Sequence, residues 1–533
     1  MTDEAWLTPA SFAQERIWLA GQLDPDSTVY NVPSLSPLPT GSAADVVTAL
    51  LHVVQRHEVL RTALRVGADG TLHQAVHAEL PGGLADLAST VVDLRDRPAP
   101  DRDREIADLL RRMAAVAFRL DEAPLWRCRL ARVPDGLLLL IVAHHAVYDA
   151  PTLTNLRQEL VELLTAAAEG REPKLPDLPI QYADYAAWER SQHADGAMAA
   201  DIAYWKDRLA GAPASHGLAT GRPRPHSVSY AGGAVHLPTA ALMPAIEALA
   251  RAAAATPAMV LLAAYQAVVA RLSGSDDIVV GMPLARRPLP ELQPLLGMFV
   301  NVLVLRTRVA DELTFQQLVQ RVRETMLEAY EHEGVPFQKL VEVLAPPRVP
   351  GAPPFYQLGF DFVPLNAEDD HDTAVADLTF ETSGTVSRLE YRADVFDRET
   401  VEQIAQHLIS FLTDALAAPG KRLVELGPPV TEPVPAAEPS IGPRPIGSGG
   451  PPRGDAEELV ASTFASVLDV SDVGRGDDFF ELGGHSLLAT KVAARLSAAL
   501  EAHVSIRLLF DNPTVETFAV AIEKLLTAEM EGQ

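Results

Sequence analysis

Two adjacent histidines and an aspartate, His144, His145 and Asp149, have the residue types and spacing best suited to chemistry in this sequence. Histidine takes up or releases a proton near neutral pH, because its ordinary pKa is about 6.5. Each residue alone has a simpler structural interpretation: a single histidine often fills a buried polar position, and Asp149 could cap a helix. Burying all three together is costly unless they satisfy one another. The spacing therefore indicates an acid–base site.

The residues around this pattern predict a strand before it and a helix after it. The apolar run at residues 137–143 is typical of a buried strand, and residues 126–130 alternate apolar and polar side chains. The Pro-Asp-Gly turn at residues 134–136 joins them into a predicted hairpin. Pro151 suits the first turn of a helix, and leucines follow at helical spacing. The three residues therefore lie where a strand passes into a helix.

Length, charge and cysteine content limit the class of protein. With 533 residues, the chain is long enough for three or four compact units at roughly 150 residues each. A formal charge of -27 argues against nucleic acid or an anionic membrane as a partner. The single cysteine, Cys128, allows no internal disulfide and fits a reducing compartment. The first residues do not resemble a signal peptide, and no apolar run is long enough to span a membrane, so we expect a cytoplasmic protein.

The order of predicted elements divides the chain into four parts. Residues 1–175 form an α/β lobe, with helices at 11–23, 43–57 and 104–118 and a strand at 58–64 in addition to the hairpin. Residues 176–426 form a second α/β lobe, with a helical region at 243–273 broken at Pro257, strands at 278–281 and 299–309, and a helix at 315–331. Residues 427–452 are a linker rich in Pro, Gly and Ala. Residues 453–533 form a helical domain, with helices at 456–468 and 486–499, a short turn at 506–510 and a helix after Pro513.

Ser486 stands in the last of these parts, at the predicted start of a helix. On its own, a serine there is explained as a helix N-cap. The free amides and the dipole of a helix start would also favour a phosphodiester on its hydroxyl, and Gly483 and Gly484 leave the serine uncrowded. The surrounding DDFFELGGHSLLATKV closely resembles the motif of peptidyl carrier proteins from nonribosomal peptide synthetases. This resemblance implies a four-helix bundle with 4'-phosphopantetheine bound covalently to Ser486.

The preceding 425 or so residues resemble a condensation domain of the same synthetases. HHAVYDA matches the active-site pattern of this family, in which two histidines are followed by three variable residues, an aspartate and a glycine. Other segments match family motifs in the same order along the chain: SFAQERIWL, RHEVLRT, YADYAAW, GMFVNVLVLR, HEGVPFQKL and, more weakly, RVPGAPPF. The resemblance implies two chloramphenicol-acetyltransferase-like lobes arranged as a V, with the active site in a tunnel between them.

The resemblance also implies a role for each residue of the site. The acceptor amine attacks the donor thioester, and His145 accepts the proton of the amine or holds the amine in place. His144 gives structural support. Asp149 pairs with an arginine from the second lobe, for which Arg287 fits the family pattern better than its neighbour Arg286. No metal is expected. Tethered reactants and acid–base help suit such a reaction, because a thioester is already activated.

The chain departs from the family pattern at two points. Ala150 stands where the family usually has glycine, and its methyl group makes a positive φ harder to adopt. No adenylation domain fits in the 26 residues of the linker, so a separate adenylation enzyme or another carrier must load Ser486. A phosphopantetheinyl transferase must first modify that serine, and an upstream carrier protein brings the donor.

Other functions share parts of this pattern. Epimerising relatives keep both histidines but follow their carrier, and SFAQERIWL resembles condensation domains that accept L-configured donors. Heterocyclising relatives have an aspartate-rich motif instead. Three alternatives stay open: an ester-forming reaction with a hydroxyl acceptor, release of the chain to a soluble amine, and an inactive platform that recruits other proteins. The sequence also leaves open whether the carrier of this chain presents the acceptor, the donor or both.

Overall fold

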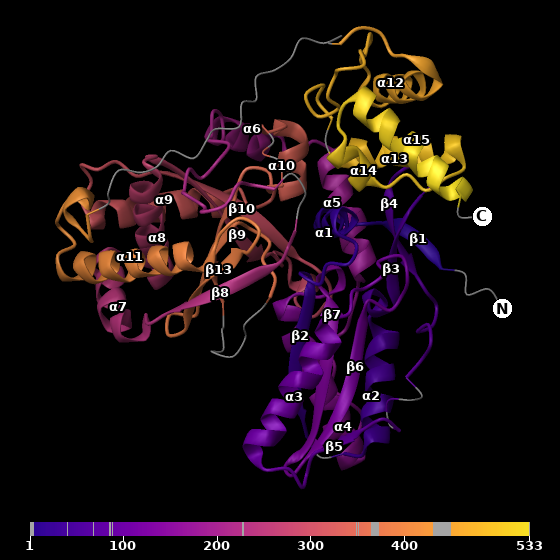
Figure 1. The fold of residues 1–533 in the computed structure, drawn as a ribbon. Coiled ribbons are helices and arrows are strands. Elements are labelled where there is room, and N and C mark those ends of the chain that lie inside the picture. The colour runs from indigo at the N-terminus through magenta and orange to yellow at the C-terminus, as the bar shows by residue number, and fades with distance from the viewer. Residues whose placement is uncertain are drawn as a thin grey trace. The chain divides into compact units, whose positions relative to one another are not determined.

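The computed structural model describes residues 5–531 except positions 40, 68, 85, 86, 88, 226–228, 348, 350, 364–371, 430–448 and 485. The chain forms two compact units (Figure 1). The first contains residues 1–197, 285–300 and 445–533, and the second contains residues 198–284 and 301–444. Most of the predicted linker lies outside the described residues.

The described residues of the first unit form two sheets. The larger has the strand order β2 (Asn31–Leu38), β7 (Gly136–His144), β6 (Trp126–Val133), β5 (Val92–Asp93). Its β6–β7 pair is antiparallel with Val133 opposite Gly136, which confirms the predicted hairpin. The smaller sheet has the order β1 (Trp6–Pro9), β4 (Leu72–Val76), β3 (Thr62–Val66). Because β7 lies between two neighbours, its apolar run is buried, as the sequence predicted.

The helices of the first unit, apart from those of the carboxy-terminal segment, are α1 (Phe12–Leu23), α2 (Ala43–Arg56), α3 (Ala99–Ala114), α4 (Ala150–Glu169) and α5 (Tyr182–Ala194). Ser11 and Ser42 begin α1 and α2 with reciprocal capping bonds. The helix predicted at 104–118 starts earlier, because Pro100 suits the first turn of α3. The strand predicted at 58–64 is wrong in its first half, which is a 3-10 turn (Glu58–Arg61) before β3.

The described residues of the second unit form one sheet, in the strand order β10 (Val300–Arg308), β9 (Asp277–Ala285), β11 (Leu358–Phe362), β12 (Leu378–Thr382), β13 (Ser387–Arg392), β8 (Gly232–Leu237). Phe360, Phe380 and Leu389 lie opposite one another on neighbouring strands and are fully buried. Tyr265 of helix α8 (Pro257–Ser273) contacts Phe380 and donates its hydroxyl to the Leu378 carbonyl at 3.1 Å. The apolar face of this sheet therefore packs against α8.

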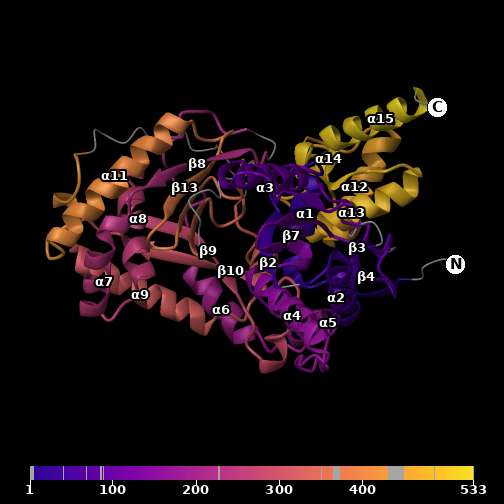
Figure 2. The same cartoon turned by 90° about the horizontal axis from the view of Figure 1, so that it is seen from below.

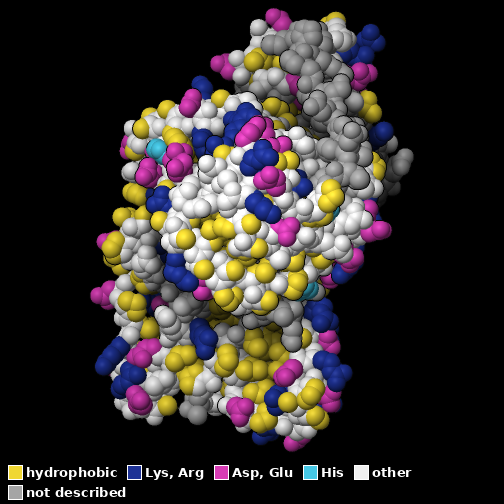
Figure 3. Space-filling view, turned by 90° about the vertical axis from the view of Figure 1, so that its left-hand side faces the viewer, with side chains coloured by type: hydrophobic (Ala, Val, Ile, Leu, Met, Phe, Trp, Pro, Cys, Tyr) yellow, Lys and Arg dark blue, Asp and Glu magenta, His cyan; other side chains and the backbone are white. Residues whose placement is uncertain are grey.

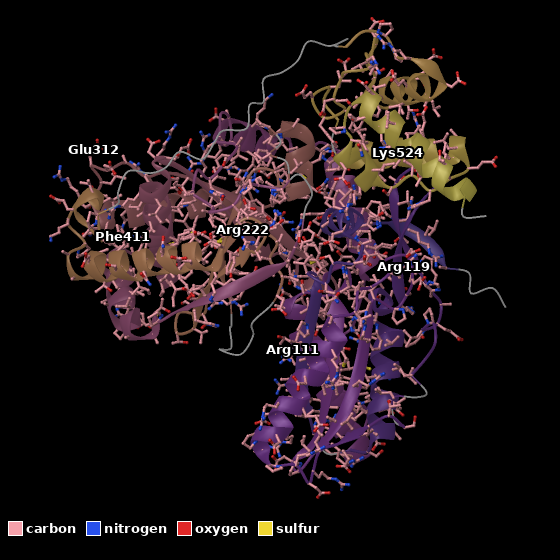
Figure 4. All side chains as sticks on the ribbon, in the orientation of Figure 1. Arg111, Arg119, Arg222, Glu312, Phe411 and Lys524 are labelled. Carbon is pink, nitrogen blue, oxygen red and sulfur yellow. The ribbon has the colours of Figure 1, made fainter. Side chains whose placement is uncertain are left out.

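The helices of the second unit are α6 (Ala199–Arg208), α7 (Met243–Ala252), α8 (Pro257–Ser273), α9 (Phe315–Glu331), α10 (Phe337–Leu344) and α11 (Arg398–Ala417). The break predicted at Pro257 is confirmed, since Thr256 caps α8 there, and α9 has the predicted bounds. Figure 2 shows α7, α8 and α9 side by side. Phe411 of α11, labelled in Figure 4, packs edge-on against Phe315 with ring centroids 5.8 Å apart.

No single helix among the described residues is long and apolar enough to span a membrane. One pair, residues 240–252 and 257–273, passes by length and composition but bends by 103°. The second member of this pair, α8, is almost wholly buried in the protein core. On the face seen in Figure 3, positively and negatively charged side chains are mixed and do not gather by sign.

The carboxy-terminal segment forms four helices, α12 (Gly454–Leu468), α13 (Ser486–Leu500), α14 (Ile506–Asp511) and α15 (Val515–Glu531). Phe464, Phe479 and Phe518 are fully buried and pack together at its centre. Arg475 pairs with Glu457 of α12 and Glu516 of α15, at 2.8 Å in both cases. The turn predicted at 506–510 is a short helix, because Ser505 caps it.

Candidate active site

The catalytic pattern lies at the junction between β7 and α4. His144 is the last residue of β7, opposite Asn31 of β2. Residues His145–Val147 form one 3-10 turn, and α4 begins at Ala150 with Asp149 as its N-cap. The strand end and the helix start therefore fix the backbone on both sides of the pattern, where the sequence placed it.

His144 is held as a neutral imidazole. Its side chain is buried, and its Nδ1 accepts a hydrogen bond from the Ala146 amide at 3.3 Å. Burial, together with the smaller effect of the neighbouring His145, lowers the pKa of His144 to about 3. The rings of Tyr30 and Phe118 approach it edge-on, with centroids 6.2 and 6.0 Å away. His144 therefore stays uncharged at neutral pH, with its ring oriented by the backbone.

His145 is half-buried and lies beside Tyr30. Its amide donates to the Tyr30 carbonyl at 2.8 Å, and the two rings lie edge-on with centroids 6.4 Å apart. Burial lowers the pKa of His145; the Asp149 carboxylate opposes this shift and the Arg16 guanidinium adds to it. Within the described part of the chain, its buried Nδ1 has no hydrogen-bond partner. A neutral imidazole is the form that accepts a proton.

Asp149 is fully buried and accepts four hydrogen bonds. Its Oδ1 accepts from the Thr152 amide at 2.9 Å, the Thr152 hydroxyl at 2.6 Å and Arg287 Nη2 at 2.8 Å. Its Oδ2 accepts from the Phe299 amide at 3.1 Å. The carboxylate thus satisfies two donors of Thr152 at the start of α4 and neutralises the charge of Arg287. The carboxylate therefore acts as a structural anchor below the histidines.

Arg287 is the arginine that contacts Asp149. Its side chain is 4% exposed; Nη1 donates to the carbonyls of Leu292 and Leu295 at 2.8 and 2.6 Å, and its guanidinium stacks 3.9 Å from the Phe299 ring. This arginine was predicted to come from the second lobe, residues 176–426. Residues 285–300 instead belong to the first compact unit, because their backbone bonds to α4 and α5, so the ion pair lies within one unit.

The site includes residues that the sequence analysis did not single out. The Thr152 hydroxyl lies 2.9 Å from the Gly297 carbonyl and accepts from the Gly297 amide at 3.0 Å. The Tyr182 hydroxyl donates to the Met298 carbonyl at 2.6 Å. A Cβ at Gly297 would overlap the Tyr182 ring, so glycine is required there. Thr152 could have been found from its position three residues after an N-cap; the contacts of Tyr182 carry no local signal.

Two other motifs named in the sequence analysis support the same loop. In SFAQERIWL, Ser11 caps α1, and Gln14 Nε2 donates to the Ala146 carbonyl at 3.2 Å. In RHEVLRT, His57 Nε2 lies 3.0 Å from both carboxylate oxygens of Glu159 on α4. These motifs therefore hold the 3-10 turn and α4 in place.

Ala150, the departure from the family pattern, is the first residue of α4 and is exposed. The backbone φ angle of Ala150 is not positive. A helical backbone needs no glycine, so the expected conflict between the methyl group and a positive φ does not arise here.

The region around Ser486 fits a covalently attached phosphopantetheine. Ser486 is the first residue of α13, where backbone amides favour a phosphate. Gly483 has φ +97°, and a Cβ at Gly484 would overlap Phe479, so the loop needs both glycines to reach the helix. His485, and Arg348 and Pro350 of RVPGAPPF, lie outside the described residues. Within the described ranges, no group of three or more His, Cys, Asp or Glu side chains could hold a metal ion.

Comparison with known proteins assigns each of the two parts of the chain to a protein family. The condensation-domain profile matches residues 5–429, and the profile of the phosphopantetheine attachment site matches residues 458–522. Tyrocidine synthase 2 of Brevibacillus parabrevis is 33% identical over 440 residues, which cover 78% of this chain and 12% of that protein. Phosphinothricin tripeptide synthetase PhsC of Streptomyces viridochromogenes is 34% identical over 448 residues, which cover 80% of this chain and 40% of that protein. The chain thus spans less than half of the length of either relative.

Solved structures show the same fold. The X-domain of teicoplanin biosynthesis, in complex with OxyB, has a TM-score of 0.66 and 26% identity over 80% of this chain and 97% of that chain. The first condensation domain of the calcium-dependent antibiotic synthetase has a TM-score of 0.64 and 22% identity over 80% of this chain and 99% of that chain. This chain therefore belongs to the condensation-domain family of nonribosomal peptide synthetases, with a chloramphenicol-acetyltransferase-like fold and a carboxy-terminal phosphopantetheine attachment domain.

Proposed function

We propose that the chain forms an amide bond between a donor acyl or peptidyl thioester and an acceptor amine, with His145 as the catalytic residue. One observation carries this proposal: a half-buried imidazole with a lowered pKa stands on a loop that is fixed at both ends. Such a group accepts the proton that the amine loses when it attacks the donor carbonyl. Positioned acid–base help of this kind typically contributes about 10²–10⁴-fold to the rate.

The other residues of the site position this imidazole. His144 stays neutral, so no second positive charge opposes proton uptake by His145. Asp149 and Arg287 neutralise one another below the loop and hold the start of α4. We propose that both residues are structural supports rather than participants in the proton transfer.

We propose Ser486 as the attachment point of phosphopantetheine. When bound, this arm supplies the thioester that makes an acyl group reactive toward an amine. The position of Ser486 at the start of α13 supports the assignment, as does the match of residues 458–522 to the attachment-site family. The arm of this chain then carries the acceptor amine, and an upstream carrier protein brings the donor.

Three partners follow from this scheme. A phosphopantetheinyl transferase modifies Ser486, an adenylation enzyme acting in trans loads the arm, and the donor carrier protein visits the site. The domain boundaries that we propose for these roles are those predicted from the sequence: lobes at 1–175 and 176–426, a linker at 427–452 and the carrier at 453–533. Residues 176–197 and 285–300 of the second lobe belong to the first compact unit. A cytoplasmic location fits this scheme and the single cysteine of the chain.

A recruitment platform is the second candidate function. One observation favours it: the likeness to the X-domain, whose structure was solved in complex with OxyB. The alternatives with a hydroxyl acceptor or a soluble amine differ from the main proposal only in the nucleophile. One experiment distinguishes these candidates by the product that forms or by the absence of any product.

The experiment loads Ser486 with a panel of aminoacyl groups from aminoacyl-coenzyme A and supplies N-acyl-aminoacyl thioesters of N-acetylcysteamine as donors. Intact-protein mass spectrometry follows the carrier. Condensation adds the donor acyl mass to the parent chain. His145→Ala should slow this gain by about 10²–10⁴-fold while loading persists. Ser486→Ala should abolish loading.

The same masses separate the other outcomes. A parent chain that gains no mass across the panel contradicts amide formation on its own carrier. Release of a free amide from the donor indicates a soluble acceptor, and binding of another biosynthetic protein without turnover indicates a platform. A His145→Ala variant with the parent rate would remove His145 from the mechanism.

A further inference from the structure

Gln14 of α1 connects the start of its own helix to the 3-10 turn that begins with His145. Its Oε1 accepts from the Ser11 amide at 3.1 Å, as part of the capping bonds of α1. Its Nε2 donates to the Ala146 carbonyl in the turn at 3.2 Å and lies 3.4 Å from Gln74 Oε1 on β4. A backbone amide only donates and a carbonyl only accepts, so these partners fix the orientation of the fully buried Gln14 amide group.

Capping of α1 alone does not require glutamine. The third residue of a helix completes this pattern as glutamate or as glutamine, because either side chain offers an oxygen to the N-cap amide. Gln317 has the same position in α9, where its Oε1 accepts from the Thr314 amide at 2.9 Å. Gln317 is exposed, and no described residue accepts a hydrogen bond from its NH₂ group. What distinguishes Gln14 is the donor that it directs at the turn.

The carbonyl that Gln14 binds lies between groups that hold both histidines. Ala146 follows His145 directly and is fully buried. Its amide donates to His144 Nδ1 at 3.3 Å, and the His145 carbonyl accepts from the Tyr148 amide at 3.3 Å. A buried carbonyl without a donor is costly, so loss of the Gln14 bond favours rotation of the turn toward another donor. Such a rotation would move the imidazole of His145 with it.

Helix α1 gives this bond a fixed base. Ser11 Oγ lies 2.8 Å from the Tyr182 hydroxyl, and the Phe12 amide donates to Glu189 Oε2 at 2.9 Å. Tyr182 and Glu189 both lie on α5, so the start of α1 is held to a second helix at two points. A side chain on a helix that is held in this way positions a loop more precisely than a side chain on another loop.

We propose that Gln14 is a positioning residue for condensation: its NH₂ group holds the Ala146 carbonyl and thereby fixes the direction of the His145 imidazole. This inference deepens the proposed function and rests on it. A fully buried side chain touches no reactant, so its loss should lower kcat and leave KM for the donor within about threefold. Misplacement of a reacting group by about 1 Å costs up to about 10²-fold in rate, so we expect kcat to fall by about 10–10²-fold.

Gln14→Glu separates the two bonds, because glutamate keeps the oxygen that the Ser11 amide needs and loses the donor. At high pH its carboxylate would face the Ala146 carbonyl, another acceptor, so kcat should be low. Burial raises the pKa of a carboxyl group, and the protonated group donates to the carbonyl and restores the bond. The ratio of kcat in the variant to kcat in the parent should therefore rise as the pH falls from about 9 to about 6.

This ratio reports the introduced carboxyl group, because glutamine does not titrate in the parent. The charged or titratable side chains on the three elements that Gln14 contacts are Glu15 and Arg16 on α1, His73 on β4, and His144 and His145 at the turn. Parent and variant share all of these groups. A role limited to the capping of α1 would leave the ratio constant with pH.

Gln14→Met removes both bonds without adding a charge, so it decides the question if Gln14→Glu folds poorly. Its kcat on the folded fraction should be lower by about 10–10²-fold at every pH. Hydrogen–deuterium exchange should show a loss of protection in the peptide that covers residues 137–156. Gln317→Glu is the matched control and should keep the kcat, KM and pH profile of the parent. All assays use the aminoacyl group and the donor that give the highest parent rate.

The outcomes separate this inference from the function on which it rests. Parent-like kcat for Gln14→Met would overturn the inference, as would a kcat ratio for folded Gln14→Glu that does not change with pH. If the parent gains no donor mass with any member of the panel, the proposed function fails, and hydrogen–deuterium exchange still shows whether Gln14 holds the turn. If the parent is active and His145→Ala is impaired but neither Gln14 variant is, only the role of Gln14 fails.

Discussion

Removal of the Asp149 carboxylate should destabilise the first unit more than any other single change at the site. The buried carboxylate accepts bonds from two donors of Thr152, from Arg287 and from the Phe299 amide. In Asp149→Ala, Arg287 keeps its two carbonyl partners but loses its counter-charge, and its side chain is only 4% exposed. Breaking a buried ion pair on one side typically costs about 3–5 kcal/mol in the free energy of unfolding.

Two further variants divide this loss into its parts. In Asp149→Asn, the amide oxygen can keep three donors, but its NH₂ group then faces the Phe299 amide, which is also a donor. One unsatisfied buried group costs about 1–3 kcal/mol, so this variant should lie between the parent and Asp149→Ala. The double variant Asp149→Ala with Arg287→Met removes the unpaired charge and should be more stable than Asp149→Ala alone.

Hydrogen–deuterium exchange followed by mass spectrometry measures the loss where it occurs, together with thermal unfolding of the full chain. Peptides that cover residues 137–156 and 285–300 should lose the most protection in Asp149→Ala. The loss should be smaller in Asp149→Asn and in the double variant. Glu172→Ala is the control, because Glu172 is exposed and its side chain makes no hydrogen bond or ion pair with a described residue; it should stay within about 0.5 kcal/mol of the parent. Parent-like protection of both peptides in Asp149→Ala would refute the anchor interpretation.

Three other changes test the same geometry. Burial lowers the pKa of His144 to about 3, so below its ordinary value of about 6.5 the unfolded chain binds a proton that the folded chain does not. The free energy of unfolding should therefore fall between pH 7 and pH 5, and His144→Gln should reduce this fall in urea titrations; an equal fall in both proteins would contradict the shift. Gly297→Ala should cost more than about 2 kcal/mol in the same titrations, because its Cβ overlaps Tyr182, and parent stability would show that the ring can move aside. Ala150→Gly should leave the condensation rate within about twofold and lower the melting temperature slightly, since Ala150 is helical and exposed; a large gain in rate would show that the methyl group obstructs the substrate.

The sequence alone determined the elements that carry the site. The β6–β7 hairpin, the helix after Asp149 and the helix that begins at Ser486 were predicted from local patterns, and the structure confirms these elements. Such patterns are readable because burial repeats with the period of a strand or a helix, and because turns and caps need particular residues. The carrier and condensation motifs are local for the same reason.

Errors in the prediction also came from local signals. Residues 58–64 have the apolar content of a strand, but the first four residues form a 3-10 turn in which the Thr62 hydroxyl donates to the Glu58 carbonyl at 2.8 Å. Helix α3 begins at Ala99 because Pro100 suits its first turn, whereas apolar periodicity alone placed the start near residue 104. Competing turn and cap contacts decided these boundaries.

Only the tertiary structure decided how the site is held. Arg287 follows Asp149 by 138 positions, and no local pattern shows that residues 285–300 join the first unit. Nor does a local pattern show that a side chain at Gly297 would overlap the Tyr182 ring. The sequence shows that a buried carboxylate needs a donor, since burial of an unpaired charge is too costly. Which donor satisfies it depends on packing between segments far apart in the chain, and the fold alone brings those segments together.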